Sequence, residues 1–119
     1  MRLPDDLRHR CKRFASAVIR IFISLPKERE EVRILARQMI RSGTSVAAHA
    51  REASRARSDA EFCSKLDGLL QEADETQLWI ELLIADCMIS DPTLSEAHRE
   101  AGEIIAIFTT IVSKVRRSL

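Results

Sequence analysis

The sequence predicts an all-α protein, an antiparallel up-down-up-down four-helix bundle in which residues 1–119 form a single domain. Apolar residues recur at alternating steps of three and four positions, which places them on one face of each helix. Glycine and proline number three each and tyrosine is absent, a composition that argues against a sheet protein with many turns. The periodic stretches are joined by short links, so consecutive helices are expected to be neighbours in space.

The first helix is expected at residues 4–25 and the second at residues 27–55, with a proline at position 26 as the break between them. Gly43 lies in the middle of the second helix, where glycine costs about 1 kcal/mol relative to alanine. It belongs to a stripe of small residues, which comprises Gly43, Ala47, Ala50 and Ser54. Such a stripe would let another helix approach closely, and that contact would offset the cost of the glycine.

The third helix is expected at residues 58–90 and the fourth at residues 93–117. Ser58 and Glu61 form a capping box that starts the third helix. Pro92 is expected to stop it, because proline lacks the amide hydrogen and clashes with the preceding turn.

The third and fourth helices carry more apolar surface than a single inward-facing stripe can bury. Trp79 is part of this surplus and is expected to lie in the core or in a subunit interface. Surplus apolar surface on a small domain indicates association with another chain. The protein is therefore expected to be a homo-oligomer, and the periodicity alone does not give the number of subunits.

The composition also restricts location and chemistry. No apolar run approaches the roughly twenty residues that span a bilayer, and the start of the chain lacks the apolar stretch of a signal peptide. We therefore expect a cytoplasmic protein with no membrane partner. Cys11, Cys63 and Cys87 are odd in number and widely spaced, which favours buried thiols over disulfides or zinc ligands. No metal and no cofactor are expected.

A net charge of only +1 conceals an uneven distribution of charge. Residues 1–57 carry 14 Lys or Arg and six Asp or Glu, a net charge of +8, whereas residues 58–119 have a net charge of −7. A basic half can bind nucleic-acid phosphates, or it can pair with the acidic half within the chain or across a subunit contact. The candidate nucleic-acid-binding residues are five arginines of the first two helices, Arg13, Arg20, Arg33, Arg37 and Arg41.

A belt of polar side chains is expected where the second and third helices face each other. Because the link between them is short, folding the chain about residue 57 brings Ser42 near Glu72 and Val46 near Gly68. A buried carboxylate needs hydrogen-bonding partners, since leaving it unpaired costs several kcal/mol. The predicted belt comprises Arg41, Ser42, Thr44, Ser45, Glu72, Glu75, Thr76 and Glu81.

Two motifs in the middle of the chain are specific in combination. They are Arg41-Ser42-Gly43-Thr44-Ser45-Val46 and Glu72-Ala73-x-Glu75-Thr76-x-x-Trp79-x-Glu81-Leu82-Leu83. Together with Leu25-Pro26, Glu52-Ala53 and Phe62-x-x-Lys65-Leu66, they resemble the four-helix-bundle proteins of the 23S rRNA intervening-sequence family. The resemblance covers all four helices and implies a homopentameric ring of bundles. A related bundle is the accessory protein of diversity-generating retroelements, which binds reverse transcriptase and nucleic acid.

No motif in the sequence predicts an enzyme. A di-iron bundle needs inward-facing Glu-x-x-His motifs, and neither Glu72 nor Glu75 is followed by a histidine at that spacing. His49 lies on an apolar seam and is expected to be a hydrogen-bonded core residue. The favoured function is a non-enzymatic oligomeric adaptor that binds RNA, DNA or a nucleic-acid-bound protein through basic surface of the first two helices. The alternative is a protein-interaction ring that acts as a scaffold and has no nucleic-acid function.

Overall fold

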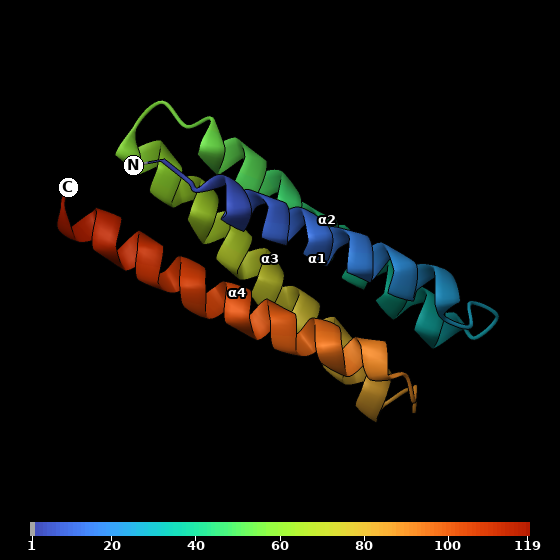
Figure 1. Cartoon of the computed structure of the whole chain (residues 1–119). Coiled ribbons are helices and arrows are strands. Elements are labelled where there is room, and N and C mark those ends of the chain that lie inside the picture. Colours follow the sequence, from blue (N-terminus) through green and yellow to red (C-terminus); the bar gives the residue numbers. More distant parts are fainter. Residues whose placement is uncertain (1) are drawn as a thin grey trace.

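The computed structural model describes residues 2–119, in which four helices lie side by side along one long axis (Figure 1). They are α1 (Asp5–Ser24), α2 (Glu30–Ser54), α3 (Asp59–Ala85) and α4 (Pro92–Arg117). The molecule measures 48 × 20 × 20 Å, and α1 begins at the end of the bundle where α4 finishes (Figure 1). No strand occurs in the described part of the chain, so the prediction of an all-α protein with four helices is confirmed.

Neighbouring helices do not contact one another equally. α2 lies between α1 and α3, and α3 lies between α2 and α4, with extensive contact in each pair. The contact between α1 and α4 is much the smallest of the four. The α1–α4 side is therefore the least closed side of the bundle.

The core is one continuous cluster of buried side chains to which every helix contributes. Its largest fully buried members include Met39, Phe62, Leu66, Ile80 and Phe108. Burying a side chain of this size stabilises a fold by about 1.5–3 kcal/mol. Only two polar residues are buried with this cluster among residues 2–119, Ser42 and Thr76.

Two predicted helix boundaries were wrong. α3 ends at Ala85 and not at residue 90, because Met88 adopts a left-handed backbone with a φ of 59° and turns the chain back. This turn brings Cys87, which is 2% exposed, into the core, and its amide donates a hydrogen bond to the carbonyl of Leu82. α2 begins at Glu30 and not at residue 27, because Arg29 is the N-cap residue and its backbone is extended, not helical.

The small residues of α2 do allow close contact with a neighbour. A Cβ atom added to Gly43 would lie only 2.8 Å from a methyl carbon of Val18, so α1 lies directly against the backbone of α2 there. Gly68 of α3 has a similar role opposite α2, because the imidazole ring of His49 occupies the space above it. Both glycines therefore let a neighbouring side chain lie where a Cβ would otherwise be.

Candidate nucleic-acid interface

A groove of about 460 Å³ runs between α1 and α2 at the end of the bundle where α1 begins. Its walls are mostly basic: Arg8, His9 and Lys12 come from the first turns of α1, and Arg51 and Arg55 come from the C-terminal end of α2. Ala47 and Ala48 form part of its lining. Side chains this short leave the space between the two helices open.

Helix geometry explains why these cations gather. Arg8 and Lys12 are four residues apart on α1, and Arg51 and Arg55 are four apart at the end of α2, so each pair lies on one face. The close contact of Val18 with Gly43 fixes how α1 lies along α2. In that register the two pairs line the same groove.

The positive charge of this groove is only slightly offset. Glu52 is its only lining carboxylate, and that side chain lies 3.8 Å from Lys65 of α3. Arg8 lies 3.6 Å from Asp5, and both side chains are partly exposed. Lys12, Arg51 and Arg55 form no ion pair with any residue of the described range.

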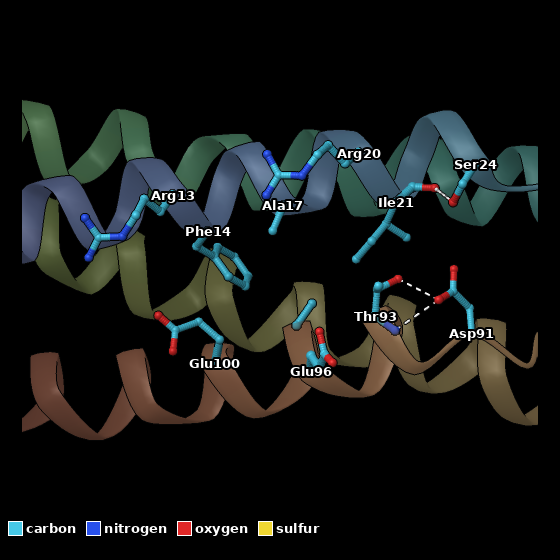
Figure 2. A pocket seen from close by; sticks show the side chains of 11 residues that line it. Arg13, Phe14, Ala17, Arg20, Ile21, Ser24, Asp91, Thr93, Glu96 and Glu100 are labelled. Atoms are coloured by element: carbon cyan, nitrogen blue, oxygen red, sulfur yellow. Dashed lines mark hydrogen bonds between the residues drawn. The ribbon is translucent and has the colours of Figure 1, made fainter.

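Arg13 and Arg20 lie elsewhere, on a second groove between α1 and α4 (Figure 2). Both are exposed, and Glu96 and Glu100 of α4 line the opposite wall. The sequence predicted one set of five arginines, but these two lie on a different part of the surface from Arg41, which contacts α3.

Of the three arginines of α2, only Arg41 contacts α3. Arg41 donates hydrogen bonds of 3.3 Å to both Glu72 and Glu75, so its charge is already paired. Arg33 lies 3.7 Å from Glu30 in its own helix. Arg37 is exposed. It is four residues from both Arg33 and Arg41, so it lies between them on the same face of α2.

The predicted polar belt is brought together only in part. Arg41 joins Glu72 and Glu75, and the hydroxyls of Ser42 and Thr76 lie 2.7 Å apart in the core. The remaining three residues make other contacts: Thr44 and Ser45 donate to carbonyls of their own helix, and Glu81 pairs with His98. Glu72 is 13% exposed and pairs with the half-exposed Arg41, so the belt consists of Arg41 with two glutamates at the edge of the bundle and a buried pair of hydroxyls beneath them.

Trp79 packs against the core, whereas His49 differs from its prediction. Trp79 is only partly buried, and its Nε1 atom is shielded from solvent without a hydrogen-bond partner. His49 is also half-buried, and its Nδ1 atom lies 3.1 Å from Glu52 without the geometry of a hydrogen bond. The expectation that His49 is a hydrogen-bonded core residue was therefore wrong.

Two titratable side chains of α1, Cys11 and Arg10, have strongly shifted pKa values. Burial raises the pKa of the Cys11 thiol to about 12, which suppresses the reactive thiolate. Arg10 binds Glu100 and Glu103, and the hydrogen bond to Glu100 raises the pKa of its guanidinium above the ordinary value. All three cysteines are buried free thiols. Residues 2–119 contain no group of three side chains that could hold a metal ion.

Sequence reasoning missed His9, Arg51 and Arg55 as members of a basic groove. The sequence does contain a sign of this groove. Ala47 belongs to the small-residue stripe, Ala48 is next to it, and Arg51 follows about one helical turn later. Folding the chain about the break at position 26 places Lys12 near Ile40 and not near Arg51, so this register is visible only in the structure.

Comparisons with known proteins agree on one family. The family model described as 23S rRNA-intervening sequence protein matches residues 6–110. A crystal structure of a protein of unknown function from the S23 ribosomal protein family of Bacteroides thetaiotaomicron is similar, with 31% sequence identity and a TM-score of 0.82. The match covers 92% of this chain and 96% of that one. No match was found among curated proteins.

No helix in residues 2–119 is long and apolar enough to cross a membrane.

Proposed function

We propose that this chain, which belongs to the 23S rRNA-intervening sequence protein family, is a non-enzymatic oligomeric adaptor that binds nucleic-acid phosphates. The family resemblance expected from the central motifs is thereby confirmed. Within the adaptor, we assign the phosphate contact to the α1–α2 groove. RNA, DNA or the nucleic acid of a ribonucleoprotein would all present the same chemistry to it.

The convergence of unpaired cations from two helices carries this proposal. Lys12 and Arg51 line one groove from opposite helices and have no carboxylate partner among the described residues. A concave surface with charge of one sign concentrates counter-ions more than a flat patch does. The arginine stripe of α2 supports it less, because Arg41 is held by Glu72 and Glu75.

Recognition in this groove would depend on charge and not on base sequence. No Phe, Tyr or Trp lines it and His9 is its only ring, so it lacks the row of aromatic side chains on which successive single-stranded bases stack. Each phosphate neutralised by Lys or Arg releases counter-ions, which makes affinity fall as salt rises. We therefore propose binding that is weak for each subunit, indifferent to sequence and sensitive to salt.

Assembly belongs to the same proposal. We propose an antiparallel up-down-up-down order of the helices and a homopentameric ring of bundles. The pairs Glu52–Lys65, Ser42–Thr76 and Glu81–His98 support the first, since partners nearer the start of one helix lie nearer the end of the next. The exposed side chains of Leu78 and Ile34 support the ring, because apolar residues on the surface favour contact with another subunit. Light scattering should give about five times the chain mass of 13.5 kDa, and a monomer or dimer would remove the ring.

The nucleic-acid proposal is tested by the salt dependence of binding. A labelled RNA is titrated with protein in filter-binding assays from about 50 to about 200 mM salt. Lys12→Gln with Arg51→Gln removes two groove cations without adding a carboxylate. Because each lost phosphate contact reduces the magnitude of the slope of log K against log salt by about 0.7 for a single-stranded nucleic acid, the double change should reduce it by about 1.4.

The matched control is Arg33→Gln with Arg37→Gln, which removes the same amount of charge, in this case from α2 alone and outside the groove. Its slope should stay close to that of the unchanged protein. If both variants lose affinity equally, the basic charge acts as a whole and the groove is not the site. If the unchanged protein retains no RNA at the lower salt, the protein-interaction ring without nucleic-acid function replaces the adaptor.

A further inference from the structure

A second groove lies between α1 and α4 and has a volume of about 560 Å³. Phe14, Ala17 and Ile21 of α1 and Ala97 of α4 provide its apolar lining. Figure 2 shows the side chains of Phe14, Ala17 and Ile21 pointing from α1 toward α4. This groove follows the side of the bundle where the two helices contact each other least.

Polar contacts join α1 to α4 at one place only, around Arg10 of α1. Arg10 binds Glu100 through hydrogen bonds of 2.7 and 2.8 Å and also binds Glu103 at 3.0 Å. No other hydrogen bond or ion pair joins α1 to α4 in the range 2–119. Beyond this clamp, toward Ser24 and Asp91, the described residues make no polar contact between the two helices.

The two rims of this groove carry opposite charges. Arg13 and Arg20 lie on the α1 rim, are exposed, and have no ionic partner in the described chain. Glu96 lies on the α4 rim and is likewise exposed without a cationic partner, whereas Glu100 is held by Arg10. The groove is therefore an apolar channel between a cationic and an anionic rim.

We propose that the α1–α4 groove binds an amphipathic helix of a partner protein. That helix would place an apolar stripe on Ala17 and Ile21, acidic residues along the α1 rim and a basic residue beside Glu96. Arg13 and Arg20 are seven residues apart, about 10.5 Å along the helix, so acidic residues seven apart on the partner would face them.

Charge complementarity favours this occupant over two others. An anionic amphiphile or lipid surface would meet Arg13 and Arg20 but would also place negative charge beside Glu96. A second copy of this chain could offer an exposed apolar residue such as Leu78, but the charged residues one turn from it, Asp74, Glu75 and Glu81, are all acidic and would repel Glu96. The site lies on a different groove from the proposed phosphate site, so a single subunit would hold a protein helix and nucleic acid at once.

Two synthetic peptides of three heptads and identical composition test the proposal by fluorescence anisotropy. Both carry a leucine stripe; in the split peptide glutamates follow one flank and lysines the other, and in the mixed peptide the two alternate on both flanks. The split peptide should bind at least tenfold more tightly than the mixed one. Equal binding of the two, or no binding up to about 1 mM peptide, would overturn the proposal.

Variants of the protein locate the binding. Arg13→Glu with Arg20→Glu should weaken the split peptide at least tenfold, whereas the matched control Arg33→Glu with Arg37→Glu should leave it unchanged. Adding Glu96→Lys to the first pair reverses the charge of both rims. This triple variant should bind the split peptide again, because a peptide that lies in the opposite direction exchanges its acidic and basic flanks. Circular dichroism checks that each variant is folded.

The same variants separate the other occupants. If Arg13→Glu with Arg20→Glu lowers the mass measured by light scattering and the peptides do not bind, the groove is a contact between copies of this chain. If oleate binds in a manner that depends on both arginines and displaces the split peptide, the groove holds an anionic amphiphile. Either result would refute a partner helix.

Discussion

Replacing Gly43 with alanine should destabilise the protein, although alanine is the better helix former. At this position a new Cβ would lie 2.8 and 3.0 Å from the two methyl carbons of Val18. Val18 is completely buried and β-branched, so its side chain has no open space and few alternative rotamers. α1 would have to move away from α2, and the α1–α2 groove depends on how closely these helices lie.

The size of the effect follows from two opposing terms. Alanine in a helix interior gains about 1 kcal/mol over glycine. Overpacking a filled core costs about 1–3 kcal/mol. The net loss in the free energy of unfolding should be about 1 kcal/mol, measured by urea denaturation at one fixed protein concentration because an oligomer couples folding to assembly.

Gly102→Ala is the matched control. Its Cβ would meet only the Nε2 atom of Gln77, at 3.2 Å, and that flexible amide can move. This variant should be stabilised by up to about 1 kcal/mol, so the two alanine variants should differ by about 2 kcal/mol. Adding Val18→Ala should cost less in the Gly43→Ala background than in the unchanged protein, as a double-mutant cycle would show. If Gly43→Ala is as stable as Gly102→Ala, α1 does not approach α2 as closely as described.

Three further changes test the core and the clamp. Thr76→Val should cost about 1 kcal/mol in chemical denaturation, whereas Thr76→Val with Ser42→Ala should cost little more, because removing both hydroxyls leaves no buried group unpaired; a strictly additive loss would contradict the pairing. Glu100→Gln should cost about 1 kcal/mol by weakening its partly exposed bond to Arg10, and an unchanged midpoint of urea unfolding would mean that the clamp adds nothing. The raised pKa of Cys11 makes the folded state keep a proton that the unfolded chain loses above pH 9, so stability should fall by about 1 kcal/mol between pH 8 and pH 10. In parallel urea titrations, the Cys11→Ala variant should lose about 1 kcal/mol less stability over this pH range than the unchanged protein. Identical pH profiles of the two proteins would refute the role of the Cys11 thiol.

The helical stretches were predictable because apolar periodicity is a local property of the sequence. The end of α3 was not, since Cys87 and Ile89 continue the apolar pattern beyond the point where the helix stops. The chain departs from the helix at Met88, a residue type that rarely has a positive φ, and burial of Cys87 stabilises the turn. Such an end is set by tertiary contacts, which the sequence pattern does not contain.

The candidate site was predictable in charge but not in place. The basic character of the first two helices is visible from composition, yet Arg13 and Arg20 lie on one groove while Arg41 pairs with carboxylates of α3. Which cations share a groove depends on the rotation of each helix about its axis. That rotation is set by contacts such as Val18 against Gly43, which require the positions of both helices.

The most direct test of the adaptor is to locate its contact with RNA on the unmodified protein. An RNA that contains 4-thiouridine is bound at low salt and irradiated, and the crosslinked peptides are identified by mass spectrometry. The account predicts crosslinks in the segments that line the α1–α2 groove, around Lys12 and around Arg51. Crosslinks confined to α3 and α4, or none above those of a control protein, would contradict it.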